Sequence, residues 1–284
     1  MSEGSAIAKA LDYSLRRWDA LTRYLDDRPR AYGATSSEFA LLCPCHIICF
    51  DRKNRISKIY NWESVELSLY VRGYAVLPHI LSAEQCEAMS SLYSQGHGYR
   101  ARVVMARHGF GRGEYKYFSY PLPSLLERLR HEIYPRLAPI ANGWNRQMGI
   151  DVMYPEDLTA FLQRCHCAGQ VRPTPLILKY AEGDYNCLHQ DIYGALVFPI
   201  QTAILLSAPG RDFEGGEFVM TERSSKGVRA DVVELRQGDA VIFSVNQRPI
   251  TSHRGVRKVA TRHGVSRIRA GKRYTAGLIF HDAE

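Results

Sequence analysis

Long apolar runs are missing from this sequence. No stretch of about 18 or more apolar residues occurs, so we expect no membrane-spanning helix. The N-terminal stretch MSEGSAIAKALDYSLRRW also lacks the basic flank and apolar segment of a signal peptide. Internal repeats and low-complexity segments are absent as well. These absences favour a globular cytoplasmic protein without a membrane partner.

Cysteine is too irregular to form a disulfide framework. The seven cysteines are odd in number and unevenly spaced, which is typical of a reduced, intracellular protein. CPCHIIC (Cys43, Cys45, His46 and Cys49) and CHC (165–167) both invite a zinc interpretation. Structural zinc sites usually separate paired cysteines by about two to four residues, whereas each of these motifs contains a Cys-x-Cys pair with only one residue between the cysteines. We therefore favour buried or helix-end thiols and leave a metal at Cys43–Cys49 open.

Acidic residues are in deficit in the C-terminal third. The whole chain of 284 residues carries a formal charge of +8, and 45% of its residues are hydrophobic, which suits a packed core. Between residues 221 and 273 there are 13 Lys and Arg against four Asp and Glu. A solvated face is the ordinary explanation of such an excess. The alternative is a groove that binds DNA or RNA.

The hydrophobic pattern divides the chain at about residue 58. Residues 1–58 form an extension of uncertain structure, in which apolar residues at helical spacing predict an amphipathic helix over 5–26. Residues 59–284 form one domain. Its first half predicts helices, one of which begins at Ser82 with Gln85 completing a capping box. After Pro175 the chain consists of short strands separated by turn residues, which is typical of a jelly roll or barrel.

The stretch YNCLHQDIYG places His189 and Asp191 two positions apart. Side chains at i and i+2 of a strand point to the same face, so both can reach one metal ion. A third ligand is needed, because two histidines and one carboxylate with open positions suit non-haem Fe(II). Three downstream histidines compete for that place: His253, His263 and His281. His253 lies among turn and basic residues and His281 lies at the end of the last strand, so we favour His263.

A basic residue follows His263 at a distance of ten positions. Arg273 opens an alternating strand, which we expect to lie alongside the strand of His263 and to turn Arg273 into the same cavity. Its planar guanidinium can hold a carboxylate with two parallel hydrogen bonds. Thr275 shares the face of Arg273, and Tyr180 is on the strand before the His-x-Asp motif. We predict that all three contact an acidic cofactor.

GFGRGEY (109–115) is a glycine-rich motif. A phosphate-binding glycine loop is followed by an apolar helix, and none follows here. We therefore expect an ordered loop at the mouth of the active site.

These motifs resemble the Fe(II)/2-oxoglutarate-dependent dioxygenase superfamily, whose pattern is His-x-Asp, a distal His and a basic residue about ten positions later. PGRDFEGGEFVM and LRQGDAVIF are similar to strands of prolyl-hydroxylase-like members. Residues 60–283, including CHCAGQVRPTPLILKY and RHGVSRIRAGKRYTAGLIFHDA, resemble a bacterial subgroup described as acting on damaged DNA.

The resemblance implies a mainly β, α+β domain built on a double-stranded β-helix, or jelly roll, flanked by helices. It implies that His189, Asp191 and His263 bind Fe(II), and that 2-oxoglutarate and O2 are consumed with release of succinate and CO2, with ascorbate as a candidate reductant. It implies oxidation of a substrate C–H bond. Three alternatives remain: demethylation of alkylated nucleic acid, hydroxylation of a protein side chain or small molecule, and a non-enzymatic nucleic-acid-binding protein.

Overall fold

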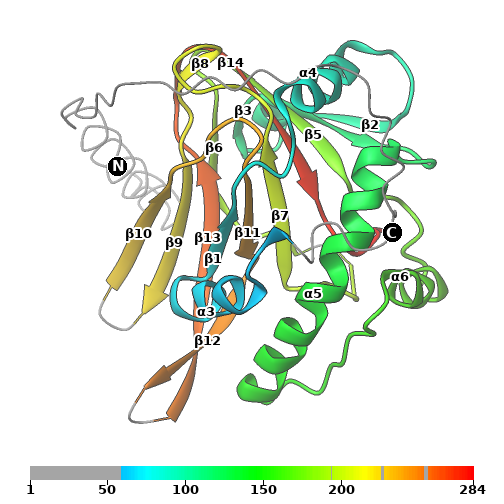
Figure 1. Cartoon of the computed structure of the whole chain (residues 1–284), viewed down its shortest axis with the longest axis vertical. Helices are drawn as coiled ribbons and strands as arrows, with labels where there is room; N and C mark the ends of the chain where they lie inside the picture. Colours follow the sequence, from blue (N-terminus) through cyan, green and yellow to red (C-terminus); the bar gives the residue numbers. More distant parts are fainter. Residues whose placement is uncertain (1–58, 193, 225–226, 253–254) are drawn as a thin grey trace, which may run out of the picture. The chain divides into compact units, whose positions relative to one another are not determined.

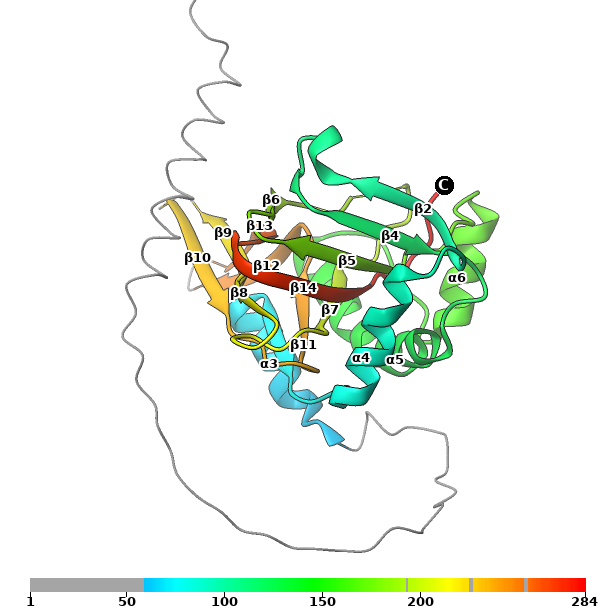
Figure 2. The ribbon, with the colours of Figure 1, turned by 90° about the horizontal axis from the view of Figure 1, so that it is seen from above.

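Two β-sheets face each other and helices cover one of them (Figures 1 and 2). The computed structural model describes residues 59–192, 194–224, 227–252 and 255–284. The helix expected over 5–26, the cysteines at 43–49, the side chain of His253 and the domain boundary at residue 58 lie outside the described residues, so these stay predictions. No helix in the described ranges is long and apolar enough to cross a bilayer.

The strands of the described residues fall into a larger and a smaller sheet. The larger sheet has the order β1-β11-β7-β14-β5-β4-β2, with β8 paired to β14. The smaller sheet has the order β10-β9-β13-β6-β3, with β12 paired to β13. In chain order, the strands are β1 (Tyr74–Leu77), β2 (Tyr99–Val104), β3 (Gly111–Arg112), β4 (Glu114–Phe118), β5 (Leu176–Ala181), β6 (Tyr185–His189), β7 (Ile200–Leu205), β8 (Phe213–Gly215), β9 (Phe218–Ser224), β10 (Gly227–Val233), β11 (Ala240–Ser244), β12 (Gln247–Ser252), β13 (Gly255–Val265) and β14 (Ile268–Leu278).

The helices precede most of the strands. They are α3 (Trp62–Arg72), α4 (Ala83–Ser91), α5 (Ser124–Met148) and α6 (Leu158–Cys167), with short 3-10 turns η1 (Leu92–Ser94) and η2 (Met105–Arg107). The expected capping box is present, because the Gln85 backbone N–H donates to Ser82 Oγ and the Ser82 N–H donates to Gln85 Oε1. Helix α3 was not expected from the sequence. It begins at Asn61, whose side chain accepts from the Ser64 N–H.

The larger sheet is buried on both faces. Ile177 and Ile204 pack into the main core with α5 and α6, whereas Leu205 and Tyr180 face the other sheet. All six residues of β7 are buried, including the polar Gln201 and Thr202, as is typical of a strand covered on both faces. The helices thus seal one side of the sheet, and the space between the two sheets is left for a site.

The expected jelly-roll architecture is confirmed, but one strand neighbour is wrong. Strand β14 does not lie alongside β13; it pairs with β5, β7 and β8 in the larger sheet, whereas β13 belongs to the smaller one. Arg273 therefore approaches His263 from the opposite sheet. The chain turns between Val265 and Ile268 and crosses the sandwich, which brings both side chains to the space between the sheets.

Candidate active site

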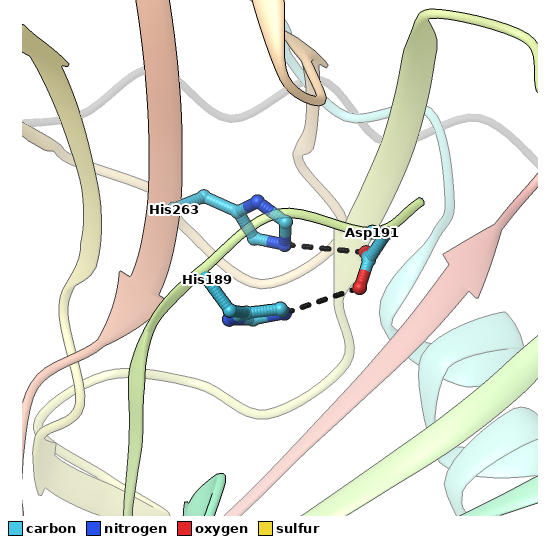
Figure 3. A group of neighbouring side chains, drawn as sticks. All are labelled: His189, Asp191 and His263. Atoms are coloured by element: carbon cyan, nitrogen blue, oxygen red, sulfur yellow. Dashed lines mark ion pairs between the residues drawn. The ribbon is translucent and has the colours of Figure 1, made fainter. Parts of the chain in front are cut away.

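His189, Asp191 and His263 meet between the sheets (Figure 3). His189 ends β6 and His263 lies opposite it on β13 in register. One Asp191 oxygen lies 3.3 Å from His189 Nε2 and the other 3.5 Å from His263 Nε2. One potential ligand atom from each residue lies within 4.8 Å of the other two. The predicted set of metal ligands is therefore assembled at one point.

Asp191 reaches this point from outside the strand. Strand β6 ends at His189, and Asp191 follows in the loop, so strand alternation alone does not orient it. The ring of His189 is fixed differently: its Nδ1 lies 2.8 Å from the Cys187 carbonyl oxygen. A proton on Nδ1 makes that hydrogen bond, and Nε2 is then directed toward Asp191 and His263. Such a bond is the usual way in which a metal-binding histidine is oriented.

The three groups shift one another's ionisation. Burial alone would raise the pKa of Asp191, but hydrogen bonds from His189 and His263 hold it well below its usual range. Burial also opposes protonation of His189, yet the Asp191 carboxylate outweighs it and raises the pKa of His189. The pKa of His263 is lowered by burial and by the neighbouring His189. A carboxylate that stays charged beside histidines is the donor set that a divalent cation requires.

A cavity of about 220 Å³ opens beside the three residues. Its walls are mostly apolar, with Phe218, Phe243 and Leu178 among them. Ligand pockets for drug-sized molecules span about 300–1,000 Å³, so this one suits a smaller molecule. GFGRGEY contributes Phe110 and Tyr115 to the wall, as expected of its position, but it is not a loop throughout, because it contains β3 and the start of β4.

The three residues predicted to contact an acidic cofactor line the same cavity. Arg273 on β14 pairs in register with Tyr180 on β5, and Arg273 Nη1 donates to Thr275 Oγ1 at 2.6 Å. The guanidinium carbon of Arg273 lies 5.8 Å from the centre of the Tyr180 ring and 5.8 Å from the centre of the Phe213 ring. The three residues thus lie in one cavity, as predicted, although Arg273 comes from the opposite sheet and not from a strand beside that of His263.

Arg273 is a buried cation without a carboxylate partner. It is 2% exposed, and burial lowers its pKa to about 10, so it stays charged at neutral pH. No carboxylate of the described residues forms an ion pair with it; Glu217 acts at longer range and pairs with Arg269. Its Nε and the Tyr180 hydroxyl have no hydrogen-bond partner in the described chain. Buried charges and polar groups without partners are costly, so this end of the cavity fits a bound carboxylate.

The structure also describes two alternatives that the sequence offered: His281 as the third metal ligand, and the cysteines of CHC as zinc ligands. His281 is fully buried beside Phe198, whose backbone N–H donates to His281 Nδ1 at 3.2 Å. It does not belong to the metal-ligand cluster. In CHC, Cys165 is buried within α6 and Cys167 ends that helix, exposed and free. One thiol is buried and the other lies at the helix end, as expected.

Some residues that line the cavity could not be predicted from the spacing of the histidines. Gln190 lines the cavity, and its Nε2 donates to the carbonyls of Asn246 and Thr261, which ties the His-x-Asp loop to β13. Tyr117 and Met105 come from a hairpin that the sequence did not predict as strands. The alternating EYKYF after the glycines was the available signal for β4.

Comparison with known proteins finds one matching family and two proteins of similar sequence. Residues 113–283 match a family described as "oxygenase, catalysing oxidative methylation of damaged DNA". Two uncharacterized proteins from two strains of Mycobacterium tuberculosis are each 46% identical over 167 residues, which covers 58% of this chain and 72% of theirs.

Solved structures show looser likenesses. A Pseudomonas putida prolyl-4-hydroxylase has a TM-score of 0.46 at 12% identity, covering 79% of this chain and 100% of that chain. An oxidoreductase of the 2OG-Fe(II) oxygenase family from Burkholderia pseudomallei has a TM-score of 0.46 at 17% identity, covering 79% of this chain and 94% of that chain.

Proposed function

The chain belongs to this oxygenase family, and from that premise we propose that it is an Fe(II)- and 2-oxoglutarate-dependent dioxygenase that demethylates alkylated nucleic acid. The observation that carries the proposal is the pairing of two features in one cavity. A His-Asp-His cluster lies at one place, and the unpaired cation of Arg273 lies at another. A molecule that chelates a metal at one end and carries a carboxylate at the other satisfies both.

His189, Asp191 and His263 would hold Fe(II), and Arg273, Thr275 and Tyr180 would hold the far carboxylate of 2-oxoglutarate. When bound, iron and 2-oxoglutarate together supply the power to oxidise a C–H bond with O2, releasing succinate and CO2. Arg273 orients the dianion through its fork, with the Thr275 hydroxyl fixing one arm of that fork. Phe218, Phe243 and Leu178 keep the cavity apolar, which strengthens these electrostatic contacts.

Oxidation of an N-methyl group gives an N-hydroxymethyl group, which releases formaldehyde and restores the N–H. The test is formaldehyde release from an N-methylated single-stranded oligonucleotide, supplied with Fe(II) and 2-oxoglutarate. We expect one formaldehyde per succinate, and none from the unmethylated oligonucleotide. The rate of succinate release is also compared with the rate without any substrate. If the methylated oligonucleotide does not raise this rate but a peptide or small molecule does, the enzyme hydroxylates that substrate and the demethylation proposal is wrong.

A further inference from the structure

The mouth of the cavity is built by one hairpin. Residues 99–118, here called the β2–β4 hairpin, contain β2, η2, β3 and β4. Strand β4 pairs with β5 of the larger sheet, and β3 pairs with β6 of the smaller sheet, so the hairpin connects both sheets. Phe110, Tyr115 and Tyr117 of this hairpin line the cavity. Aromatic rings thus form the wall that a substrate passes.

Phe110 is an exposed ring held in a fixed place. Its residue is 41% exposed, and its ring stacks on His108 with centroids 5.6 Å apart and an angle of 22°. Its N–H donates to the Met105 carbonyl at 3.2 Å, and its carbonyl accepts from the Cys187 N–H at 2.9 Å. The Cys187 carbonyl in turn binds the ring of His189. An apolar ring exposed at a cavity mouth and anchored to a metal ligand is placed to bind a substrate.

The hairpin also carries cations without partners. It contains five Lys and Arg and one acidic residue, Glu114. Arg102 pairs with Glu114, and Arg100 and Lys116 donate to the carbonyls of Pro173 and Tyr93.

Two arginines remain, one on each side of Phe110. Arg107 is exposed and forms no hydrogen bond or ion pair within the described residues. The side chain of Arg112 is 60% exposed, and its Nε lies 3.9 Å from Asp184, a weak contact in water. Both guanidinium groups are therefore available to an anionic partner.

We propose that the β2–β4 hairpin is a platform for single-stranded nucleic acid, with one base stacked on Phe110 and the adjacent phosphates held by Arg107 and Arg112. This rests on the proposed function, because the strand must deliver its alkylated base to the iron. Aromatic faces alternating with cations are the usual means of binding unpaired strands. A cavity of about 220 Å³ admits a single base but not a duplex, so the base must be unstacked.

The basic C-terminal region (221–273) is a weaker candidate for a nucleic-acid interface than its composition indicated. Arg248 is 1% exposed and pairs with Glu222, and Arg229 pairs with Glu222 and Asp231. Arg273 lies inside the cavity. Arg257 and Lys258 are exposed on β13, but neither lines the cavity. These two residues serve as the matched control for the two arginines of the hairpin.

The experiment is fluorescence anisotropy of a labelled single-stranded DNA of about 12 nucleotides, a length within the range that one such platform covers, titrated with the full chain over a salt series. We expect Phe110→Ala and Phe110→Leu to weaken binding about tenfold or more, and Phe110→Tyr to retain it. Leu67→Ala, which changes an exposed apolar residue on α3, is the control.

The double variant of Arg107→Ala and Arg112→Ala should reduce the slope of log affinity against log salt by about 1.4, while Arg257→Ala with Lys258→Ala should not. A duplex of the same sequence should bind more weakly and should not respond to Phe110→Ala.

Retained affinity in Phe110→Leu would contradict stacking, and a reduced slope in the Arg257 and Lys258 variant alone would move the interface to β13. Duplex binding that depends on Phe110 as strongly as single-strand binding would also overturn the proposal. Iron-dependent succinate release by the parent protein is measured in parallel. Its absence would refute the proposed function, whereas its presence with unaltered DNA binding in the hairpin variants would refute the platform alone.

Discussion

At the scale of single residues, Asp191 supplies the negative charge of the candidate metal site. Its pKa is held low against burial by His189 and His263, so it is ionised throughout the neutral range. Each histidine is turned toward it by a different constraint: His189 by the Cys187 carbonyl, and His263 by its register opposite His189 on β13. The residue types and their spacing were enough to predict that these three residues lie together, because strand pairing brings residues distant in sequence to one point.

We predict that His263→Ala abolishes Fe(II) binding and 2-oxoglutarate turnover. The variant removes one of three ligand atoms, and Asp191 loses one of the two groups that stabilise its charge. His97→Ala changes an exposed histidine far in sequence from the cluster and should bind iron as the parent does. Metal content measured after equilibration and desalting tests this. Equal iron in His263→Ala and the parent would show that His263 is not a ligand.

We also predict that Arg273→Lys weakens 2-oxoglutarate binding about tenfold or more, since a lysine keeps the charge but loses the bidentate fork. Arg269→Lys, which alters an arginine paired with Glu217, should bind normally. The measurement is a calorimetric titration of the Fe(II)-loaded protein without oxygen. Identical affinity in Arg273→Lys and the parent would be incompatible with a carboxylate held at Arg273.

At the scale of elements, the β2–β4 hairpin and β6 are built against each other. Gly111 has a φ of +118°, and a Cβ there would overlap the Tyr185 carbonyl of β6. The sequence predicted an ordered loop at 109–115, where the structure has β3 and the start of β4. It also failed to place β14, because the alternation of Arg273 and Thr275 says which face they share and not which strand lies beside them.

Gly111→Ala should lower the free energy of unfolding by about 1–3 kcal/mol more than Gly109→Ala does. Both glycines have positive φ, +118° and +71°, but no atom lies near the Cβ position at Gly109. The difference therefore reports the contact with β6 together with the greater backbone strain of an alanine at φ +118°. Urea denaturation of the two variants measures it. Equal losses of stability would mean that the hairpin is not packed closely on β6.

At the scale of the whole molecule, the C-terminal residues are tied into the buried face of the helices. Arg130 of α5 donates to the Ile279 carbonyl at 2.8 Å and pairs with Asp282 at 2.9 Å. His281 lies between them in sequence, fully buried, with Nε2 lacking a partner within the described residues. Burial, and then the cation of Arg130, lower the pKa of His281 to about 4. The sequence predicted only that His281 is not the third metal ligand, and it gave no sign of this burial.

This depressed pKa makes stability depend on pH. The unfolded chain protonates His281 near pH 6.5 and the folded chain near pH 4, so the free energy of unfolding falls as pH decreases between these values. This contribution is fully present above about pH 6.5 and is lost at about 1.4 kcal/mol per pH unit below it. His281→Gln can still accept the Phe198 N–H without titrating. Between about pH 4 and pH 6.5, the free energy of unfolding of His281→Gln should therefore fall less steeply with decreasing pH than that of the parent, by about 1.4 kcal/mol per pH unit. Parallel curves of the free energy of unfolding against pH would mean that His281 titrates normally.

The metal centre itself is tested most directly by succinate release from 2-oxoglutarate, with and without Fe(II), in the parent and in Asp191→Ala. Asp191 is the one carboxylate of the cluster and lies beside both histidines. We predict iron-dependent succinate in the parent, none in the parent without iron, and none in Asp191→Ala at any iron concentration. Succinate formed equally by Asp191→Ala, or formed by the parent without iron, would contradict an oxygenase centre at His189, Asp191 and His263.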